Sequence, residues 1–307
     1  MRRIFTPFMT AAFVVCMSVA SFAEGRVFGA SFMNMDSPYF AAMENTIRSL
    51  IEYNDDTLIT LDPERNQDKQ NFQLREMIDE GVDAIFLTPV DSVKVLDGLE
   101  TCAKAGIPVI NLDSPVQNEE LVECEICSDN LEAGQLCGEN LLKRVWGGRV
   151  ALLEDPITKT GVDRIAKFEE IIGTNPGFNI AARRDSKGLA SSSEAAMRDI
   201  LQKSPGIDIV MCVSDTVAMG AIAALREAGI LKNVLVYGVD GSPEAKKAIK
   251  DGDMAGTSAQ SPINIGQIGV DTAYQILDGK KPKKHITVPV LFISDKNIDQ
   301  FFINGWQ

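Results

Sequence analysis

The sequence predicts an α/β protein made of two similar, doubly wound lobes. Short apolar strands alternate with amphipathic helices along most of the chain, which is typical of parallel sheets with right-handed crossovers. A buried strand that ends in Asp before Ser-Pro occurs twice, at residues 107–113 and 234–240. In each copy an earlier strand begins at an Asp, 30 positions before Asp113 and 32 positions before Asp240. We therefore expect two related lobes, each presenting one aspartate to a shared cleft.

The amino terminus has the pattern of a secretory leader. A basic start at Arg2 and Arg3 is followed by an apolar run over residues 8–19 and by the small residue Ala23. This pattern predicts a signal peptide over residues 1–23, cleaved after Ala23. We therefore expect an exported, extracytoplasmic (periplasmic) protein.

Composition narrows the class further. The 307-residue chain without its leader is long enough for two domains, each with its own core. Its formal net charge of −13 becomes more negative when the two leader arginines are removed. Such a chain is repelled by nucleic acid, so no nucleic-acid partner is expected.

The order of elements follows from apolar periodicity and from glycines at the helix ends, such as Gly81, Gly106 and Gly229. We expect strands near residues 26–32, 57–61, 83–87, 107–112, 122–127, 149–153, 178–183, 208–213, 234–239, 254–259 and 286–292. We expect helices near residues 38–53, 66–80, 92–105, 129–145, 161–173, 192–203, 216–228, 243–251, 262–278 and 296–302. Single helices between strands indicate parallel sheets.

Five cysteines remain after the leader. One or two structural disulfides are expected among Cys102, Cys124, Cys127 and Cys137, with the pairing left open. Cys212 lies in an apolar strand and is expected to fill the core. The chain has one histidine, so no metal site is expected, and no motif calls for a cofactor.

Asp113 and Asp240 are the first candidates for chemistry. Two facing carboxylates can act as the acid/base pair of a glycoside hydrolase. They can equally accept hydrogen bonds from neighbouring hydroxyls of a bound ligand. Arg164, at the start of a helix, offers a fixed fork of donors to the same ligand, or else forms a surface salt bridge.

Further candidates stand where other strands end. Asp36 or Ser37 is expected to cap the first helix, and Tyr39 and Phe40 follow at once. Because Tyr39 and Phe40 are adjacent, they are not expected to share one helix face. Either one of them packs in the core and the other lies on the surface, or one presents an aromatic face that stacks on a sugar. Ser214 ends a later strand, where Asp215 is expected to cap the next helix.

Several short stretches of the chain, taken in order, resemble a known family. The matching stretches are Asp36-Ser-Pro-Tyr-Phe40, Gly81-Val-Asp-Ala-Ile, Gly106-Ile-Pro-Val-Ile-Asn-Leu-Asp113, Ser128-Asp-Asn130, Arg164-Ile-Ala-Lys-Phe168, Ser214-Asp-Thr-Val-Ala-Met-Gly-Ala221, Tyr237-Gly-Val-Asp-Gly-Ser-Pro243 and Ala259-Gln-Ser-Pro262. Together they resemble the type I periplasmic sugar-binding proteins of the ribose-binding group, the solute receptors of ABC importers. The resemblance covers the whole chain after the leader.

The resemblance implies two lobes joined by three crossovers and closing on a sugar or polyol. It implies an N-terminal lobe of residues 24–128 plus 261–290 and a C-terminal lobe of residues 129–260 plus 291–307. It implies a binding protein, with the membrane permease of an ABC importer as partner and a chemoreceptor as an open second partner. It carries ligand-binding roles to Ser37, Tyr39, Phe40, Asp113, Arg164, Ser214, Asp240 and Gln260.

The chain departs from the ribose-binding pattern beside both aspartates. Ser114 stands where the family has Arg, and Val239 where ribose binders have Phe. Ser114 is too short to supply the planar donors of an arginine, and Val239 would remove an aromatic wall. We therefore add Ser114 and Val239 to the site and expect a neutral sugar or polyol other than ribose. An exported hydrolase using Asp113 and Asp240 is the alternative.

Overall fold

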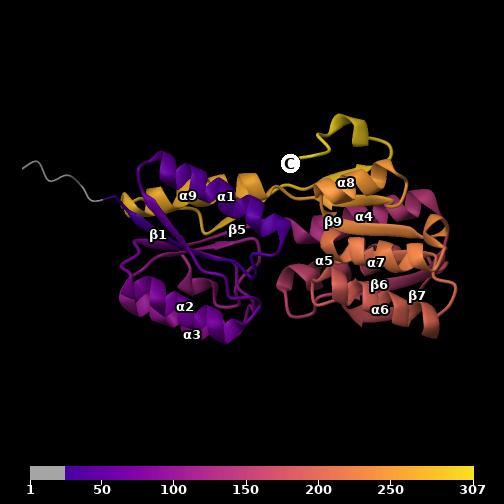
Figure 1. Cartoon of the computed structure of the whole chain (residues 1–307), viewed down its shortest axis with the longest axis horizontal. Coiled ribbons are helices and arrows are strands. Elements are labelled where there is room, and N and C mark those ends of the chain that lie inside the picture. The colour runs from indigo at the N-terminus through magenta and orange to yellow at the C-terminus, as the bar shows by residue number, and fades with distance from the viewer. Residues whose placement is uncertain (1–24) are drawn as a thin grey trace, which may run out of the picture.

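The computed structural model describes residues 25–307 and contains two six-stranded sheets, each with helices on both faces (Figure 1). The strand order is β11-β5-β4-β3-β1-β2 in the first sheet and β12-β10-β9-β8-β6-β7 in the second. Every strand pair is parallel except β10 with β12. The predicted two doubly wound lobes are confirmed. The predicted signal peptide, residues 1–23, lies outside the described residues.

The first lobe contains the N-terminal part of the described chain and a later segment, α9 and β11, that returns to it. Its strands are β1 (Val27–Ser31), β2 (Thr57–Thr60), β3 (Ala84–Leu87), β4 (Val109–Leu112), β5 (Cys124–Ser128) and β11 (His285–Val288). Its helices are α1 (Pro38–Tyr53), α2 (Gln67–Asp79), α3 (Leu96–Ala105) and α9 (Pro262–Leu277), with a 3₁₀ turn at Glu119–Leu121. Helices α1 and α9 cover one face of the sheet, and α2 and α3 cover the other (Figure 1).

The second lobe is built from the middle of the chain and the segment after β11. Its strands are β6 (Gly148–Glu154), β7 (Phe178–Asp185), β8 (Ile209–Cys212), β9 (Leu235–Asp240), β10 (Gly256–Ala259) and β12 (Leu291–Ser294). Its helices are α4 (Asn130–Arg144), α5 (Lys159–Ile172), α6 (Ala190–Lys203), α7 (Asp215–Glu227) and α8 (Pro243–Lys250), with 3₁₀ turns at Leu231–Asn233 and Ile298–Gln300. Helices α4 and α5 pack together on one face, and α6 and α7 pack together on the other.

The central strands are apolar throughout because helices cover both of their faces. In β3, Ala84 and Phe86 belong to the core beneath α1 and α9, whereas Ile85 and Leu87 belong to the core beneath α2. Side chains alternate between the faces of a strand, so a strand buried on both sides has no polar face. This alternation explains the continuous apolar runs of the sequence.

The internal similarity of the lobes extends to single hydrogen bonds. The carboxylate of Asp83 accepts a 2.7 Å hydrogen bond from the backbone N–H of Val27 at the start of β1. The carboxylate of Asp208 accepts a 2.8 Å bond from the N–H of Arg149 in β6. These are the two aspartates from which the sequence repeat was measured, and they hold equivalent strand starts in the two sheets.

The chain passes between the sheets three times: after β5, after β10, and between β11 and β12. The sequence predicted one strand over residues 286–292, which is wrong. Pro289 cannot donate to a ladder, so the run divides into β11 in the first sheet and β12 in the second. The predicted helix 296–302 is also wrong. Only a 3₁₀ turn forms there, and the ammonium of Lys246 instead binds the carbonyls of Phe302 and Gly305.

The expected disulfides are wrong. All five cysteines of the described residues are free and buried. Cys124 and Cys127 are three positions apart on β5, so their side chains point to opposite faces of the sheet. Cys137 lies in the other lobe, within the core of α4 and α5. Cys212 is fully buried in a core cluster, as predicted.

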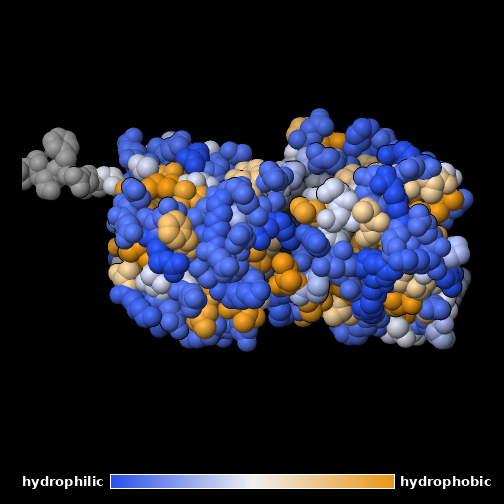
Figure 2. Space-filling model, turned by 60° about the horizontal axis from the view of Figure 1, so that its bottom comes forward, coloured by the Kyte–Doolittle hydropathy of each residue, from blue (hydrophilic) through white to orange (hydrophobic). Residues whose placement is uncertain are grey.

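The outer surface is mainly polar. Figure 2 shows a face on which hydrophilic residues predominate and hydrophobic ones form small, separate groups. Within residues 25–307, no helix combines the length and the apolar character needed to cross a membrane.

Candidate functional site

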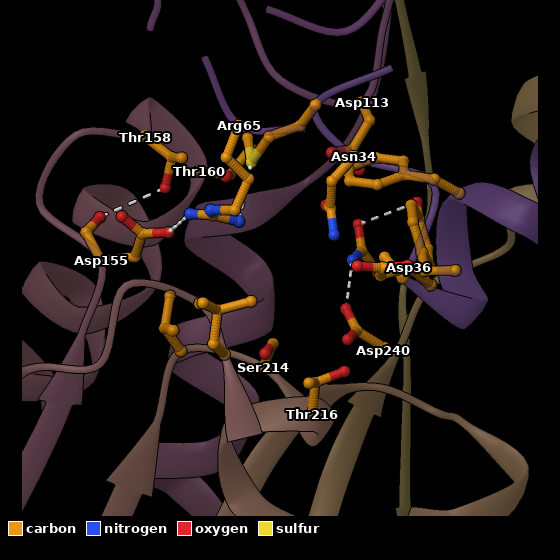
Figure 3. Close-up of a pocket in the computed structure, with 18 of the residues that line it drawn as sticks. Asn34, Asp36, Arg65, Asp113, Asp155, Thr158, Thr160, Ser214, Thr216 and Asp240 are labelled. Carbon is orange, nitrogen blue, oxygen red and sulfur yellow. Dashed lines mark hydrogen bonds and ion pairs between the residues drawn. The ribbon is translucent and has the colours of Figure 1, made fainter. Parts of the chain in front are cut away.

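A cavity of about 130 Å³ lies between the lobes, at the carboxyl ends of the strands (Figure 3). The loops that follow β1, β2 and β4 supply its wall from the first lobe, and those after β6, β7, β8 and β9 supply the facing wall. This edge is where open α/β sheets bind ligands. Eight of the ten predicted site residues line the cavity: Ser37, Tyr39, Phe40, Asp113, Arg164, Ser214, Asp240 and Gln260.

Asp113 is presented by a tight, strained turn. The N–H of Ser114 donates to the carbonyl of Leu112 over 2.8 Å, which closes a three-residue turn around Asp113 with φ at +65°. Asn111 supports the loop, since its side-chain amide donates to the carbonyl of Ser114. A positive φ is uncommon outside Gly and is characteristic of functional sites. The Asp113 side chain is buried, and its Oδ1 has no hydrogen-bond partner.

Asp240 faces Asp113 from the second lobe and also has a positive φ, +135°. Its Oδ1 accepts a 2.8 Å hydrogen bond from the side-chain amide of Gln260, at the crossover after β10. The hydroxyl of Tyr39 lies 3.5 Å from the Oε1 of Gln260, as a donor. A chain of polar contacts therefore runs from the first lobe, through the crossover, to Asp240.

Burial shifts the pKa of both aspartates. Burial raises the pKa of Asp113, and the positive charge of Arg164 lowers it in part. Burial is also the largest cause that raises the pKa of Asp240, and the neighbouring Asp215 carboxylate raises it further. Because burial disfavours the charged form, each carboxylate gains from a ligand that donates hydrogen bonds to it.

Arg164 is a buried, oriented cation and not a surface residue. Its Nε donates to Asn130 Oδ1 over 2.7 Å, and its Nη1 donates to the carbonyl of Val213 over 3.0 Å. Nη1 also lies 3.8 Å from Asp240 Oδ1. Of the two roles that the sequence left open for Arg164, a surface salt bridge and a donor in the cleft, its burial at the cavity excludes the surface salt bridge.

Tyr39 and Phe40 correct an expectation. Although they are adjacent on α1, both are buried and both line the cavity. Their ring centroids lie 5.5 Å apart at an interplanar angle of 79°. They stand in the first turn of the helix, whose end faces the cavity, so different sides of that turn reach it. Phe40 stacks on Phe32, while Trp306 of the C-terminal tail meets Tyr39 edge-on at 5.6 Å.

Of the two helix-cap predictions, the first is confirmed in position and the second is wrong. Ser37 stands at the N-cap of α1 without a side-chain capping bond, and Asp36 is exposed at the cavity rim. At α7 the cap is Ser214, whose hydroxyl accepts from the N–H of Val217. Asp215 is buried and instead accepts hydrogen bonds from the Thr257 hydroxyl and the Ser242 N–H, which fixes the turn after Asp240.

Ser114 and Val239 do not line the cavity. Ser114 is buried behind Asp113, in the loop that Asn111 holds. Val239 precedes Asp240 on β9, so its side chain points to the opposite face, into the core with Tyr237 and Leu152. A larger side chain at 239 would enter this core, so the inference of a missing aromatic wall has no geometric basis.

Sequence reasoning missed several lining residues. They are Met33, Asn34, Arg65, Asp155, Thr158, Thr160, Gly188, Leu189, Val213 and Thr216. Asp155 could have been found, because it follows the apolar strand β6 and stands directly before a proline. Asp113 and Asp240 also follow apolar strands and stand shortly before a proline. Arg65 gave no such signal, since it lies in a polar loop.

The arrangement is suited to binding hydroxyl groups. It combines buried carboxylates, an oriented arginine and two aromatic side chains in one small cavity. In the part of the chain that the structure describes, no group of three or more His, Cys, Asp or Glu is placed to hold a metal ion.

Comparisons with known proteins all identify the same family. A family model described as "Periplasmic binding protein domain" matches residues 28–281. The ribose import binding protein of Bacillus subtilis is 28% identical over 270 residues, which cover 87% of either chain. The galactofuranose-binding protein of Escherichia coli is 28% identical over 299 residues, 94% of either chain.

Solved structures of sugar- and polyol-binding proteins are also similar to this chain. An ABC transporter solute binding protein from Bacillus halodurans with bound myo-inositol superposes with a TM-score of 0.84 at 25% identity, covering 90% of this chain and 96% of that one. A galactofuranose binding protein superposes with a TM-score of 0.85 at 26% identity, with the same coverage.

Proposed function

The chain belongs to the periplasmic binding protein family, and on that premise we propose that it captures a sugar or polyol between its lobes and delivers it to an ABC importer. The observation that carries the proposal is the cavity between the lobes, with Asp113 on one wall and Asp240 on the other. The relatives named above bind ribose, galactofuranose and myo-inositol, which all present several hydroxyl groups.

The contacts favour a neutral, hydroxyl-rich ligand. Asp113 Oδ1 is a buried acceptor without a donor, and a ligand hydroxyl would satisfy it. Asp240 and Arg164 offer an acceptor and a donor close together. Tyr39 and Phe40 supply apolar surface for the C–H face of a sugar ring. We propose ligand-binding roles for these five residues and for Ser37, Ser214 and Gln260.

We further propose the lobes as residues 24–128 plus 261–290 and residues 129–260 plus 291–307. The predicted leader and the family support export to the periplasm, where we propose that an importer's permease receives the loaded form. A chemoreceptor remains a second proposed partner.

The hydrolase alternative has no support among the comparisons. The matched family consists of binding proteins for transport, and the chain is a binding protein and not an enzyme. Buried carboxylates that accept hydroxyl hydrogen bonds account for the site without a reaction.

A thermal-shift screen tests this proposal on the mature protein. The panel contains D-ribose, D-allose, D-galactose, D-fucose, L-arabinose, D-tagatose, galactofuranose and myo-inositol, with glucuronate as an acidic control. We expect at least one neutral member to raise the melting temperature in proportion to the logarithm of its concentration. The ligand should be recovered chemically unchanged after prolonged incubation. A shift with no neutral member would contradict the proposal, and turnover of the ligand would restore the hydrolase.

The ligand is proposed to be other than ribose. Ser114 gives no side chain to the cavity, so the donors that the family places beside this aspartate are missing. Ribose binding that is tighter than that of every other panel member would contradict the proposal.

A further inference from the structure

One ion pair connects the two lobes. Arg65 Nη2 lies 3.0 Å from Asp155 Oδ2, with Arg65 in the loop after β2 and Asp155 directly after β6. Among the salt bridges of residues 25–307, no other pair joins the first lobe to the second. Figure 3 shows this pair on one side of the cavity, with Asp113, Asp36 and Asp240 on the other.

The strand order places the pair far from the crossovers. The chain crosses between lobes at β5, β10, β11 and β12, which lie at one end of their sheets. Strand β2 is the opposite edge of the first sheet, and β6 is next to the opposite edge of the second. Arg65 and Asp155 therefore meet at the end of the cleft away from the crossovers, which we call the mouth end.

The local backbone holds this pair in place. Glu64 and Arg65 have φ values of +53° and +59°, and the N–H of Arg65 donates to the carbonyl of Met33 in the loop after β1. Gly188 packs against the pair so closely that a Cβ there would lie 2.9 Å from Asp155 Oδ2. Strained residues of this kind persist where the surrounding structure fixes them, often at ligand clamps.

The other carboxylate oxygen has no partner. Asp155 is 5% exposed, Arg65 occupies its Oδ2, and its Oδ1 is buried without any hydrogen bond. Asp113 Oδ1 is in the same condition on the opposite wall of the same cavity. Buried acceptors are rarely left unpaired, and both aspartates line the same cavity, so their unpaired oxygens indicate two places where a ligand donates.

We propose that Asp155, oriented by Arg65, forms a second polar subsite at the mouth end, which accepts a hydrogen bond from a ligand hydroxyl. Asp113 and Asp240 bind the other end of the same ligand. The inference rests on the proposed function and narrows its ligand class to sugars and cyclitols with hydroxyls at opposite ends of the carbon frame, the size of a hexose. Because Arg65 already balances the charge of Asp155, a neutral hydroxyl fits the subsite.

Titration calorimetry of wild type and Asp155→Asn tests the subsite. The probe is the panel sugar that wild type binds most tightly, together with its monodeoxy analogues. We expect Asp155→Asn to weaken binding of the parent sugar about tenfold to a hundredfold. One monodeoxy analogue should bind wild type about tenfold more weakly than the parent, yet bind Asp155→Asn as well as the parent does. That coupling is specific to a direct contact.

Two further variants complete the design. Arg65→Met should weaken binding as well, whereas Arg183→Met, which removes an ion pair with Glu154 within the second lobe, should leave the affinity unchanged. Asp155→Ser replaces Asp155→Asn if the latter has a lowered melting temperature. If Asp155→Asn weakens binding of the parent sugar and of every analogue by the same factor, the pair only holds the lobes together and the subsite is overturned. An unchanged affinity of Asp155→Asn for the parent sugar would overturn the subsite as well. If wild type binds no panel sugar, the proposed function itself fails.

Discussion

Asp113 and Asp240 share a backbone feature that no composition argument reveals. Both have positive φ, +65° and +135°, although Gly would adopt such angles at lower cost. Each ends a strand whose hydrogen bonding continues up to it, and each is buried at the cavity between the lobes. The strain, of about 1–3 kcal/mol for each residue, is stored where the ligand is proposed to bind.

The first prediction concerns these two carboxylates. Asp113→Ala and Asp240→Ala should each weaken sugar binding by roughly tenfold to more than a hundredfold, because ligand hydroxyls lose a buried acceptor. Titration calorimetry measures the change. Asp79→Asn, at an exposed position on α2, is the control and should bind as wild type does. Normal binding by both alanine variants would mean that the ligand lies elsewhere.

The second prediction concerns pH. Burial raises the pKa of Asp240 above its ordinary value of 3.8, so the folded state keeps a proton that the unfolded state loses. This contribution to stability is complete below pH 3.8 and is lost as pH rises toward the raised pKa. Asp240→Asn should therefore melt at a higher temperature than ligand-free wild type at about pH 8, with a smaller difference at about pH 5. Calorimetric melts check this, and parallel curves for the two proteins would contradict it.

At the scale of elements, the C-terminal tail joins the parts that form the cleft. Its backbone carbonyls at Phe302 and Gly305 bind the buried ammonium of Lys246 on α8. Its last residue accepts a hydrogen bond from the hydroxyl of Ser261 at a crossover. Between these anchors, Trp306 meets the ring of Tyr39 on the first lobe. The tail thus supports a cavity residue from outside the cavity.

The third prediction follows from that contact. Trp306→Ala should weaken sugar binding about two- to tenfold, because an edge-on aromatic pair contributes ~0.5–1.5 kcal/mol beyond its buried area. Trp306→Phe keeps an aromatic ring and should restore most of the affinity. Calorimetry measures both variants. If alanine and phenylalanine behave alike, the ring contact does not position Tyr39.

At the scale of the whole molecule, two similar lobes enclose one cavity and are connected at one end. The three crossovers lie together at the strands β5, β10, β11 and β12. Asp113 and Asp240 come from different lobes, so one ligand can bind both only when the cleft is closed. Ligand binding and lobe closure are therefore linked: the ligand favours the closed state by its additional contacts there.

The fourth prediction tests this linkage. Small-angle scattering should show a smaller radius of gyration when a sugar that raises the melting temperature is added. A sugar that gives no thermal shift is the control and should leave the scattering curve unchanged. Asp113→Ala should lose the contraction at the same sugar concentration, since one lobe no longer holds the ligand. A tightly bound ligand without any contraction would contradict closure.

The sequence by itself determined the two α/β lobes and the order of most of their strands and helices. Strands buried on both faces read as apolar runs, and glycines mark the helix ends, so local chemistry specified most elements. The same logic located Asp113 and Asp240, because a polar residue directly after a buried strand must stand at the sheet edge. Arg164 was proposed from its place at the start of a helix and Gln260 from the family resemblance, and both line the cavity.

Only the tertiary structure decided what depends on side-chain direction and on segments distant in sequence. The strand pleat turned Val239 into the core, and Pro289 divided one predicted strand between two sheets. Cysteines that looked close in sequence were placed on opposite faces and in different lobes. Arg65 and Asp155 are 90 positions apart and meet only because two separately folded lobes face each other. Sequence pattern reports local conformation, whereas such contacts are set by the packing of whole lobes.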